Sequence, residues 1–225
     1  RSIARENSFS NLDLEKKIWI HSEIAFSIHQ TGQRFIRQED ALGLLEKVLP
    51  KYGIAPSESL SCLAQLTSNH GIIGRLSASL VGFHHLALQE FCAARWLSNE
   101  TRWKSHLSRE AVESNWWLHT IALVSGTLSD ATDYVSHLWS YPGLTEAHQA
   151  KLASECLKMD PVIDAELRRQ IVSKILNWYH NGNKTQRGLA VDMLVGVDDA
   201  WIAPDIKRSL AGALPNKMIA ELLKR

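Results

Sequence analysis

The chain has 225 residues, of which 45% are hydrophobic and 22% are charged, and its formal net charge is +1. This length is sufficient for one large or two small packed domains. The near-zero net charge gives no global reason to expect binding to nucleic acid or to an anionic membrane. No apolar run approaches the roughly 20 residues that a membrane-spanning helix needs, and no signal-peptide pattern opens the sequence.

The first segment, 1–13, is polar and lacks periodicity, which is typical of a linker. Since the chain begins at Arg1 rather than at a methionine, we expect it to be a piece of a longer protein.

Three helices are predicted before residue 70. The segment Leu14–Gln30 carries a broad apolar stripe and ends before Gly32, which suits a left-handed cap. The segment 38–49 places Leu42, Leu45, Val48 and Leu49 on one face and stops before a proline. Pro56 opens the third helix, which we expect to end at 69–71.

Two short strands, 71–76 and 80–83, follow these helices and are joined by 77–79, which predicts a β-hairpin. Helix, helix, helix, hairpin is the order of a winged-helix domain. Such domains can bind DNA through the third helix, where Lys and Arg contact phosphates. Because no Lys or Arg occurs from Pro56 to His70, DNA binding is disfavoured, and protein packing or nucleotide sensing fits better.

The segment 81–97 carries an ordered set of residue types: Phe83, His85, Gln89, Glu90, Phe91, Ala93 and Ala94. It resembles the motif F-x-H-x-[ST]-F-Q-E-[FY]-x-A-A, which closes the winged-helix region of NACHT-type signalling NTPases of the STAND class. Ala87 and Leu88 depart from this motif, since the first lacks a hydroxyl group and the second replaces another large apolar residue.

This resemblance implies the regulatory part of a nucleotide switch. In the family, the histidine at this position contacts the β-phosphate of bound ADP and holds the inactive state, a role that we assign to His85. Its expected place, between the second strand and the helix 86–97, lies beside free backbone N–H groups. The alternative is a hydrogen bond within the turn. His84 is expected to have no ligand role, and a metal site is not expected.

The other motif residues are interpreted as structural. Gln89 and Glu90 are expected to satisfy buried backbone or cross-domain hydrogen bonds, because no second carboxylate or nucleophile accompanies them. Phe91, Ala93 and Ala94 predict a helix that is buried on several sides. No residue is assigned a catalytic role.

The chain contains no Gly-Lys dipeptide and therefore no phosphate-binding loop of the form G-x-x-x-x-G-K-[ST]. We expect this fragment to be no enzyme and to hold no cofactor by itself. The resemblance implies an upstream P-loop domain in cis that binds ATP or ADP with magnesium, and oligomerisation on activation. The acidic pair Asp198-Asp199 is interpreted as structural rather than magnesium-binding.

An internal repeat occupies the last third of the chain. The segment 149–157 aligns with 186–194, and 160–168 aligns with 199–207, so that a unit of two helices recurs after just under ~40 residues. This spacing is typical of a HEAT-like α-solenoid. Asn181-Gly182-Asn183, Pro204 and Pro215 lie at the expected breaks, and Asp160 and Asp199 are expected to cap helices.

The predicted fold is therefore mainly α, with a winged-helix-like domain over 14–98, a helical junction over 99–143 and HEAT-like repeats over 144–225. Cys62, Cys92 and Cys156 have neither zinc-site nor disulfide spacing, so we expect buried thiols and a cytoplasmic location. The resemblance implies a sensor whose repeats bind a protein partner or trigger, in innate immunity or antiviral defence. The alternative is a stand-alone helical-repeat adaptor that binds protein without nucleotide.

Overall fold

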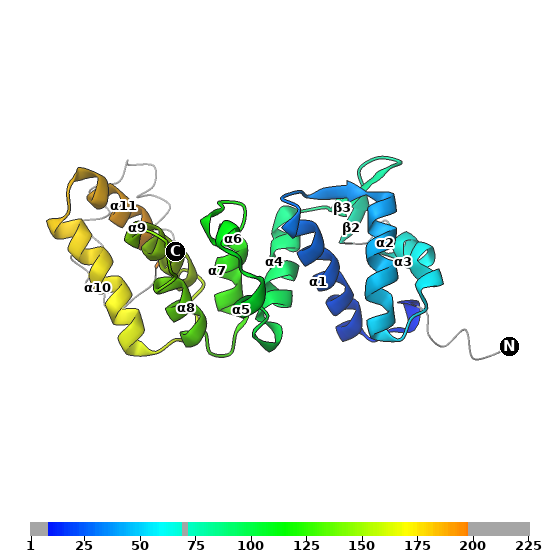
Figure 1. Ribbon diagram of the computed structural model, residues 1–225, viewed down its shortest axis with the longest axis horizontal. Helices are drawn as coiled ribbons and strands as arrows, with labels where there is room; N and C mark the ends of the chain where they lie inside the picture. The colour runs from blue at the N-terminus through cyan, green and yellow to red at the C-terminus, as the bar shows by residue number, and fades with distance from the viewer. Residues whose placement is uncertain (1–8, 69–71, 198–225) are drawn as a thin grey trace, which may run out of the picture. The chain divides into compact units, whose positions relative to one another are not determined.

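The computed structural model describes residues 9–68 and 72–197 (Figure 1). Over these residues the chain is mainly helical, as predicted, with a small three-stranded antiparallel sheet. The chain divides into two compact units, Arg1–Thr127 and Leu128–Arg225. This boundary lies within the segment 99–143, whose helices are therefore shared between the units.

The first unit contains α1 (Leu14–Gln30), β1 (Phe35–Arg37), α2 (Gln38–Val48), α3 (Ser59–Leu66), β2 (Ile73–Arg75), β3 (Leu80–Phe83), α4 (Leu86–Ser98), α5 (Trp103–His106), α6 (Arg109–Glu113) and α7 (Leu118–Thr127). The second contains α8 (Thr132–Trp139), α9 (Glu146–Leu157), α10 (Ala165–Asn181) and α11 (Lys184–Leu194). None of the described helices combines the length and the apolar character that crossing a membrane requires.

The first three predicted helices are present. α1 begins after Asp13, whose side chain accepts from the Lys16 N–H at 2.8 Å, and ends where Gly32 adopts a φ of 69°. α2 gives way to a 3₁₀ turn around a proline, and Pro56 opens another 3₁₀ turn rather than α3 itself. The predicted end of the third helix, at 69–71, lies outside the described residues.

The sheet has the strand order β1-β3-β2, with both neighbours antiparallel to β3. The hairpin of β2 and β3 was predicted, whereas β1 was not, because three residues are too few to show a strand's alternation. Phe35 of β1 lies opposite Gly82 of β3. A Cβ atom at position 82 would lie 2.2 Å from the Arg34 carbonyl oxygen, so this pairing requires glycine.

α4 forms the centre of the first unit, because α1 packs against it on one side and α7 on the other (Figure 1). Ala93 and Ala94 are both 0% exposed, and their small side chains permit this close approach. Phe26 of α1 stacks on Trp96 of α4 with 3.7 Å between the ring centroids. Phe83 is also fully buried, so three of the motif's apolar residues contribute to the core.

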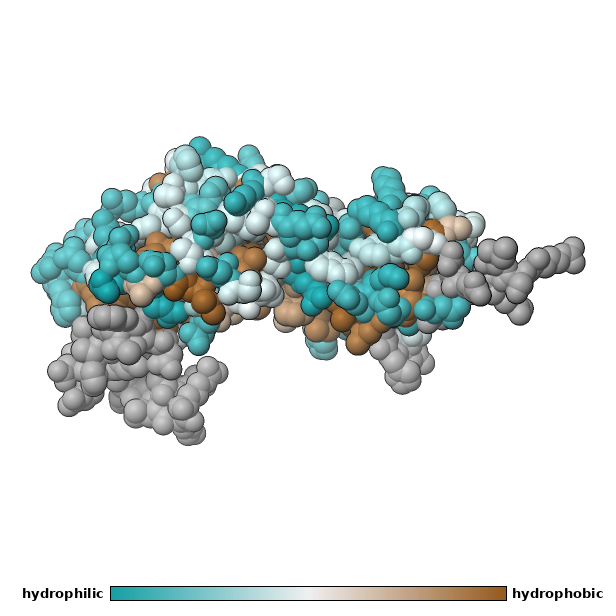
Figure 2. Space-filling model, turned by 90° about the horizontal axis from the view of Figure 1, so that it is seen from below, coloured by the Kyte–Doolittle hydropathy of each residue, from teal (hydrophilic) through white to brown (hydrophobic). Residues whose placement is uncertain are grey.

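α4 is buried on the sides that face α1 and α7, as expected, but the predicted burial of Phe91 is wrong, because Phe91 is 44% exposed and Leu88 is 37% exposed. Figure 2 shows hydrophobic residues that reach the surface in patches between hydrophilic ones on the face seen there. The large hydrophobic side chains exposed among the described residues are Leu14, Leu60, Ile72, Leu76, Leu88, Phe91, Val162 and Leu189. α4 therefore has one apolar surface that the first unit does not cover.

In the second unit, α8 contacts α9, α10 contacts α11, and α9 also contacts α11. The aligned segments 149–157 and 186–194 are both helical. The predicted break after α10 is confirmed, since Asn183 and Gln186 form a reciprocal capping box there, with bonds of 2.9 and 3.0 Å.

The cap predicted at Asp160 is wrong. Asp164 begins α10 instead, where its carboxylate accepts from the N–H groups of Glu166 and Leu167, each at 2.9 Å. Asp160 lies in the preceding turn with a φ of 48°. The segment 199–207, the acidic pair at 198–199 and the breaks at positions 204 and 215 lie outside the described residues.

Replacing Gly82 by alanine should destabilise the first unit by roughly 2 kcal/mol, because the new methyl group collides with the backbone of the neighbouring strand. Gly43, inside α2, has no atom within 4 Å of such a Cβ. Gly43→Ala should therefore stabilise the unit by about 0.5–1 kcal/mol through helix propensity. Denaturant unfolding measures the free energy of unfolding of both variants. If Gly82→Ala were as stable as Gly43→Ala, the close β1–β3 contact would be contradicted.

Candidate functional site

His85 lies between β3 and α4 and immediately precedes the first turn of α4. Its backbone is extended, with φ −125° and ψ 134°, and its carbonyl oxygen accepts from the Leu88 N–H at 3.1 Å. Its side chain is exposed and forms no capping hydrogen bond. The imidazole is therefore accessible beside the N-terminus of α4.

Arg34 holds the strand end that leads to His85. Its Nε donates to the carbonyl oxygen of Phe83 at 3.0 Å, and its Nη2 donates to that of His84. The His84 ring packs over Gly74, where a Cβ atom would come within 2.1 Å of the imidazole Cε1. Arg34 thus fixes the backbone before His85, and the ring of His84 is occupied in packing.

Gln89 lies one turn into α4, and its side chain is fully buried. Its Nε2 donates to the backbone carbonyl of Gln33 at 3.0 Å and lies 3.3 Å from Nδ1 of His29. This is the type of buried backbone contact expected of Gln89. Its Oε1 is buried without a hydrogen-bond partner in the described part of the chain.

His29, near the end of α1, lies at the centre of this polar cluster and is 0% exposed. Its Nε2 lies 3.0 Å from Oγ1 of Thr120 on α7. The indole of Trp116 stacks on the imidazole at 4.8 Å between centroids, and its Nε1 donates to the His29 carbonyl at 2.9 Å. We call His29, Gln89, Trp116 and Thr120 the His29 cluster, which joins α1, α4 and α7.

Burial lowers the pKa of His29 to about 4, so the imidazole is neutral at neutral pH. The Gln89 amide nitrogen points to a carbonyl oxygen as well as to Nδ1, and it is therefore a donor to both. Nδ1 consequently accepts, and the ring proton lies on Nε2, where it is donated to Thr120. The cluster thus specifies one tautomer of a neutral histidine.

Glu90 follows Gln89 and reaches a different neighbour. Its carboxylate is largely buried, and its Oε2 lies 2.7 Å from Nδ1 of His119 on α7. Successive helical residues point about 100° apart. The Gln-Glu pair of the motif therefore ties α4 to the loop after α1 on one side and to α7 on the other.

The His, Cys, Asp and Glu residues of the described part of the chain were compared with the needs of a metal site. No group of three or more His, Cys, Asp or Glu among them could hold a metal ion. All three cysteines are free and buried, as predicted. Burial raises the pKa of Cys62 to about 12 and that of Cys92 to about 11, which keeps both thiols protonated.

The sequence analysis did not identify three residues that shape this site, namely His29, Arg34 and Thr120. His29 has the only available signal, since it is a polar residue next to the apolar stripe of α1. Arg34 and Thr120 lie 51 and 35 positions from His85, as their numbers in the sequence give, and no local pattern connects them to it. Comparison with family models, curated proteins and solved structures gives no match to this chain.

Acidification should destabilise the first unit through His29. Because its pKa is lower in the folded state than its ordinary value of 6.5, the unfolded chain takes up a proton that the folded chain excludes. The free energy of unfolding should fall as the pH is lowered from 6.5 to about 4, by up to about 1.4 kcal/mol per pH unit from this group.

Denaturant unfolding at a series of pH values in this range measures how steeply the free energy of unfolding depends on pH. Amide exchange in α1 follows the same change at the helix that carries His29. His29→Gln should flatten this pH dependence, whereas His85→Gln should not, because His85 is exposed. An unchanged slope in His29→Gln would contradict the assignment of the buried neutral imidazole.

Gln89→Leu should destabilise the first unit by about 2 kcal/mol, since it leaves a buried carbonyl oxygen and the His29 Nδ1 without their donor. Gln30→Leu, at an exposed position at the end of α1, serves as the matched control and should change stability by less than about 0.5 kcal/mol. Thermal or denaturant unfolding compares the two variants, and equal stabilities would show that the cluster contributes nothing.

Proposed function

We propose that this chain is the regulatory and sensor segment of a NACHT-type STAND NTPase. In this proposal the first unit contains a winged helix, and His85 contacts a phosphate of ADP bound to an upstream P-loop domain in cis. The second unit belongs to a HEAT-like array that binds a protein partner or trigger. ATP or ADP and magnesium belong to the P-loop domain, and the chain described here performs no catalysis.

The element order of the first unit supports the winged-helix assignment. A helix, a short strand, two helices and a hairpin follow one another from α1 to β3. The first strand returns to pair with β3, so the hairpin and β1 form one sheet next to the helices. α3 carries no Lys or Arg, which favours a protein-facing or nucleotide-sensing domain over a DNA reader.

The position of His85 is the observation that carries the proposal. An exposed imidazole adjoins the N-terminus of a 13-residue helix, where backbone N–H groups and the positive end of the helix dipole favour an anion. Arg34 and Gln89 fix the backbone on both sides of His85 through hydrogen bonds to carbonyl oxygens. The His85 side chain can therefore contact a phosphate from a backbone that is already fixed before the ligand binds.

The second unit supports a repeat assignment through equivalent burial. Ala153 and Ala190, Cys156 and Met193, and Leu157 and Leu194 are aligned pairs, and every member is buried. The two helices that carry them, α9 and α11, contact each other, as equivalent helices of a solenoid do. Lys158 adds a link between them, since its Nζ donates to the Asp192 carbonyl at 3.3 Å.

The three free cysteines support a reducing compartment, and we propose a cytoplasmic location for the whole protein. Oligomerisation on activation, and a role in innate immunity or antiviral defence, complete the proposal by family resemblance. Of these proposals, the geometry of the site supports only the nucleotide contact.

His85→Ala tests the proposal in the protein extended by its upstream domain. Loss of one hydrogen bond to a charged phosphate should accelerate the release of fluorescently labelled ADP by about tenfold. His180→Ala, at an exposed position in α10, is the control and should leave release unchanged. Release is measured by stopped-flow fluorescence after chase with unlabelled ADP.

Unchanged ADP release in His85→Ala would remove the sensor role from this residue. If the extended protein binds no nucleotide at all, the chain is better described as a helical-repeat adaptor for proteins.

A further inference from the structure

β1 is an edge strand whose outer side carries unpaired backbone groups. The Gln38 N–H donates to the Ser79 carbonyl at 2.8 Å. The partners Ile36 and Val81 lie two residues further along this ladder and therefore form the next hydrogen-bonded pair. Hydrogen-bonded pairs alternate in an antiparallel ladder, so Ile36 bonds to β3 while Phe35 and Arg37 direct their N–H groups away from it. β1 therefore presents a short template for another strand.

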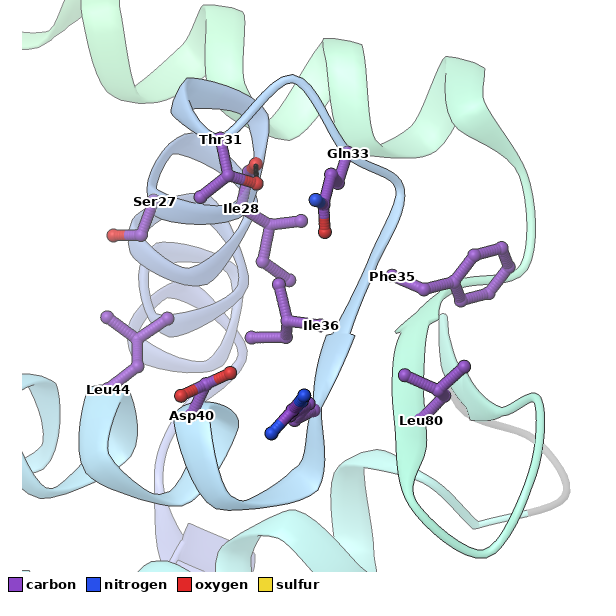
Figure 3. A pocket seen from close by; sticks show the side chains of 10 residues that line it. Ser27, Ile28, Thr31, Gln33, Phe35, Ile36, Asp40, Leu44 and Leu80 are labelled. Atoms are coloured by element: carbon purple, nitrogen blue, oxygen red, sulfur yellow. Dashed lines mark hydrogen bonds between the residues drawn. The ribbon is translucent and has the colours of Figure 1, made fainter.

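A groove of about 530 Å³ lies along this outer side (Figure 3). We call it the β1 groove; Ile28, Gln33, Ile36, Arg37, Asp40 and Leu44 are among the residues that line it. In Figure 3, the side chains of Ile28 and Ile36 point toward one another in the groove, with Gln33 near one end and Asp40 near the other. Leu44 of α2 adds a third apolar side chain to this surface.

The charges around the β1 groove favour a cation at the Asp40 end. Among the described residues, no hydrogen bond or ion pair engages the Asp40 carboxylate, whereas Arg37 is paired with Glu39 at 3.3 Å. A positively charged side chain would therefore be attracted to this end, and an acidic one would be repelled.

We propose that the β1 groove binds an extended, lysine- or arginine-bearing peptide segment of a partner protein as a fourth strand of the sheet. Backbone bonds to Phe35 and Arg37 supply the pairing. An apolar residue opposite Ile36 faces Ile28 and Leu44, because side chains opposite one another share a sheet face. A basic residue two positions away, on the same face, lies near Asp40. This binding is independent of the nucleotide contact.

The peptide acetyl-Lys-Thr-Val-Thr-Val-amide is the probe. In antiparallel register its central valine lies opposite Ile36, and its two threonines lie opposite Arg37 and Phe35. NMR of the ¹⁵N-labelled chain should show slower amide exchange at Phe35 and Arg37 on titration. The amide of Ile36, already bonded to β3, should keep its exchange rate. Absence of this alternate pattern at millimolar peptide overturns the proposal.

Peptides methylated on the backbone nitrogen separate strand addition from nonspecific adhesion. Methylating both threonine nitrogens removes the donors that face β1 and should weaken binding roughly tenfold. Methylating the central valine nitrogen, which points away from β1, should leave binding nearly unchanged. Equal losses in the two peptides overturn strand addition. The Phe35 and Arg37 amides could instead become protected without peptide as the protein concentration rises. That result would assign the β1 edge to a second copy of the chain and would overturn the proposal.

The charge preference is tested with a glutamate in place of the peptide lysine, which should bind roughly fivefold more weakly. Asp40→Asn should abolish this difference between the two peptides. Glu39→Gln is the matched control, since Glu39 is the adjacent carboxylate and is paired with Arg37, and it should preserve the difference. A preference that survives in Asp40→Asn overturns the assignment of the cationic end.

Discussion

The first unit depends on a neutral histidine buried between three helices. His29 belongs to α1, receives the amide of Gln89 from α4 and bonds to Thr120 of α7. Two oriented ring nitrogens can satisfy two different helices at once, which an apolar side chain of the same volume cannot do. The stacked ring of Trp116 closes the cluster from solvent. The fold of the unit is therefore coupled to the protonation state of one side chain.

The candidate site draws its order from this buried cluster although His85 itself is exposed. Gln89, four residues after His85, is anchored in the core and thereby sets the rotation of α4. Arg34 fixes the preceding strand end through two carbonyl oxygens. The imidazole of His85 is therefore accessible on a backbone that is held from both sides, which is the arrangement that the proposed phosphate contact requires.

The second unit is held by a different kind of constraint, the burial of a repeated helix face. Aligned positions of α9 and α11 are buried alike at the alanine, sulfur-containing and terminal leucine positions, whereas Leu152 is fully buried and Leu189 is 37% exposed. The repeated pattern thus specifies which helix face packs inward. The helices that adjoin each repeat decide how much more of the helix surface is buried.

The sequence by itself determined the elements whose signals are local. Apolar periodicity located α1 and α2, and Gly32 and a proline marked where they end. The hairpin and the break before α11, at the asparagines around Gly182, were located in the same way, because caps and turns depend on neighbouring residues. Propensity could not locate β1, since three residues acquire strand geometry only by pairing with β3. The assembly of Arg34, His29 and Thr120 around α4 was decided by tertiary structure alone. Hydrogen bonds between residues 50 and 91 positions apart leave no periodic trace in a sequence. Burial, which lowers the pKa of His29, exists only once the helices have packed.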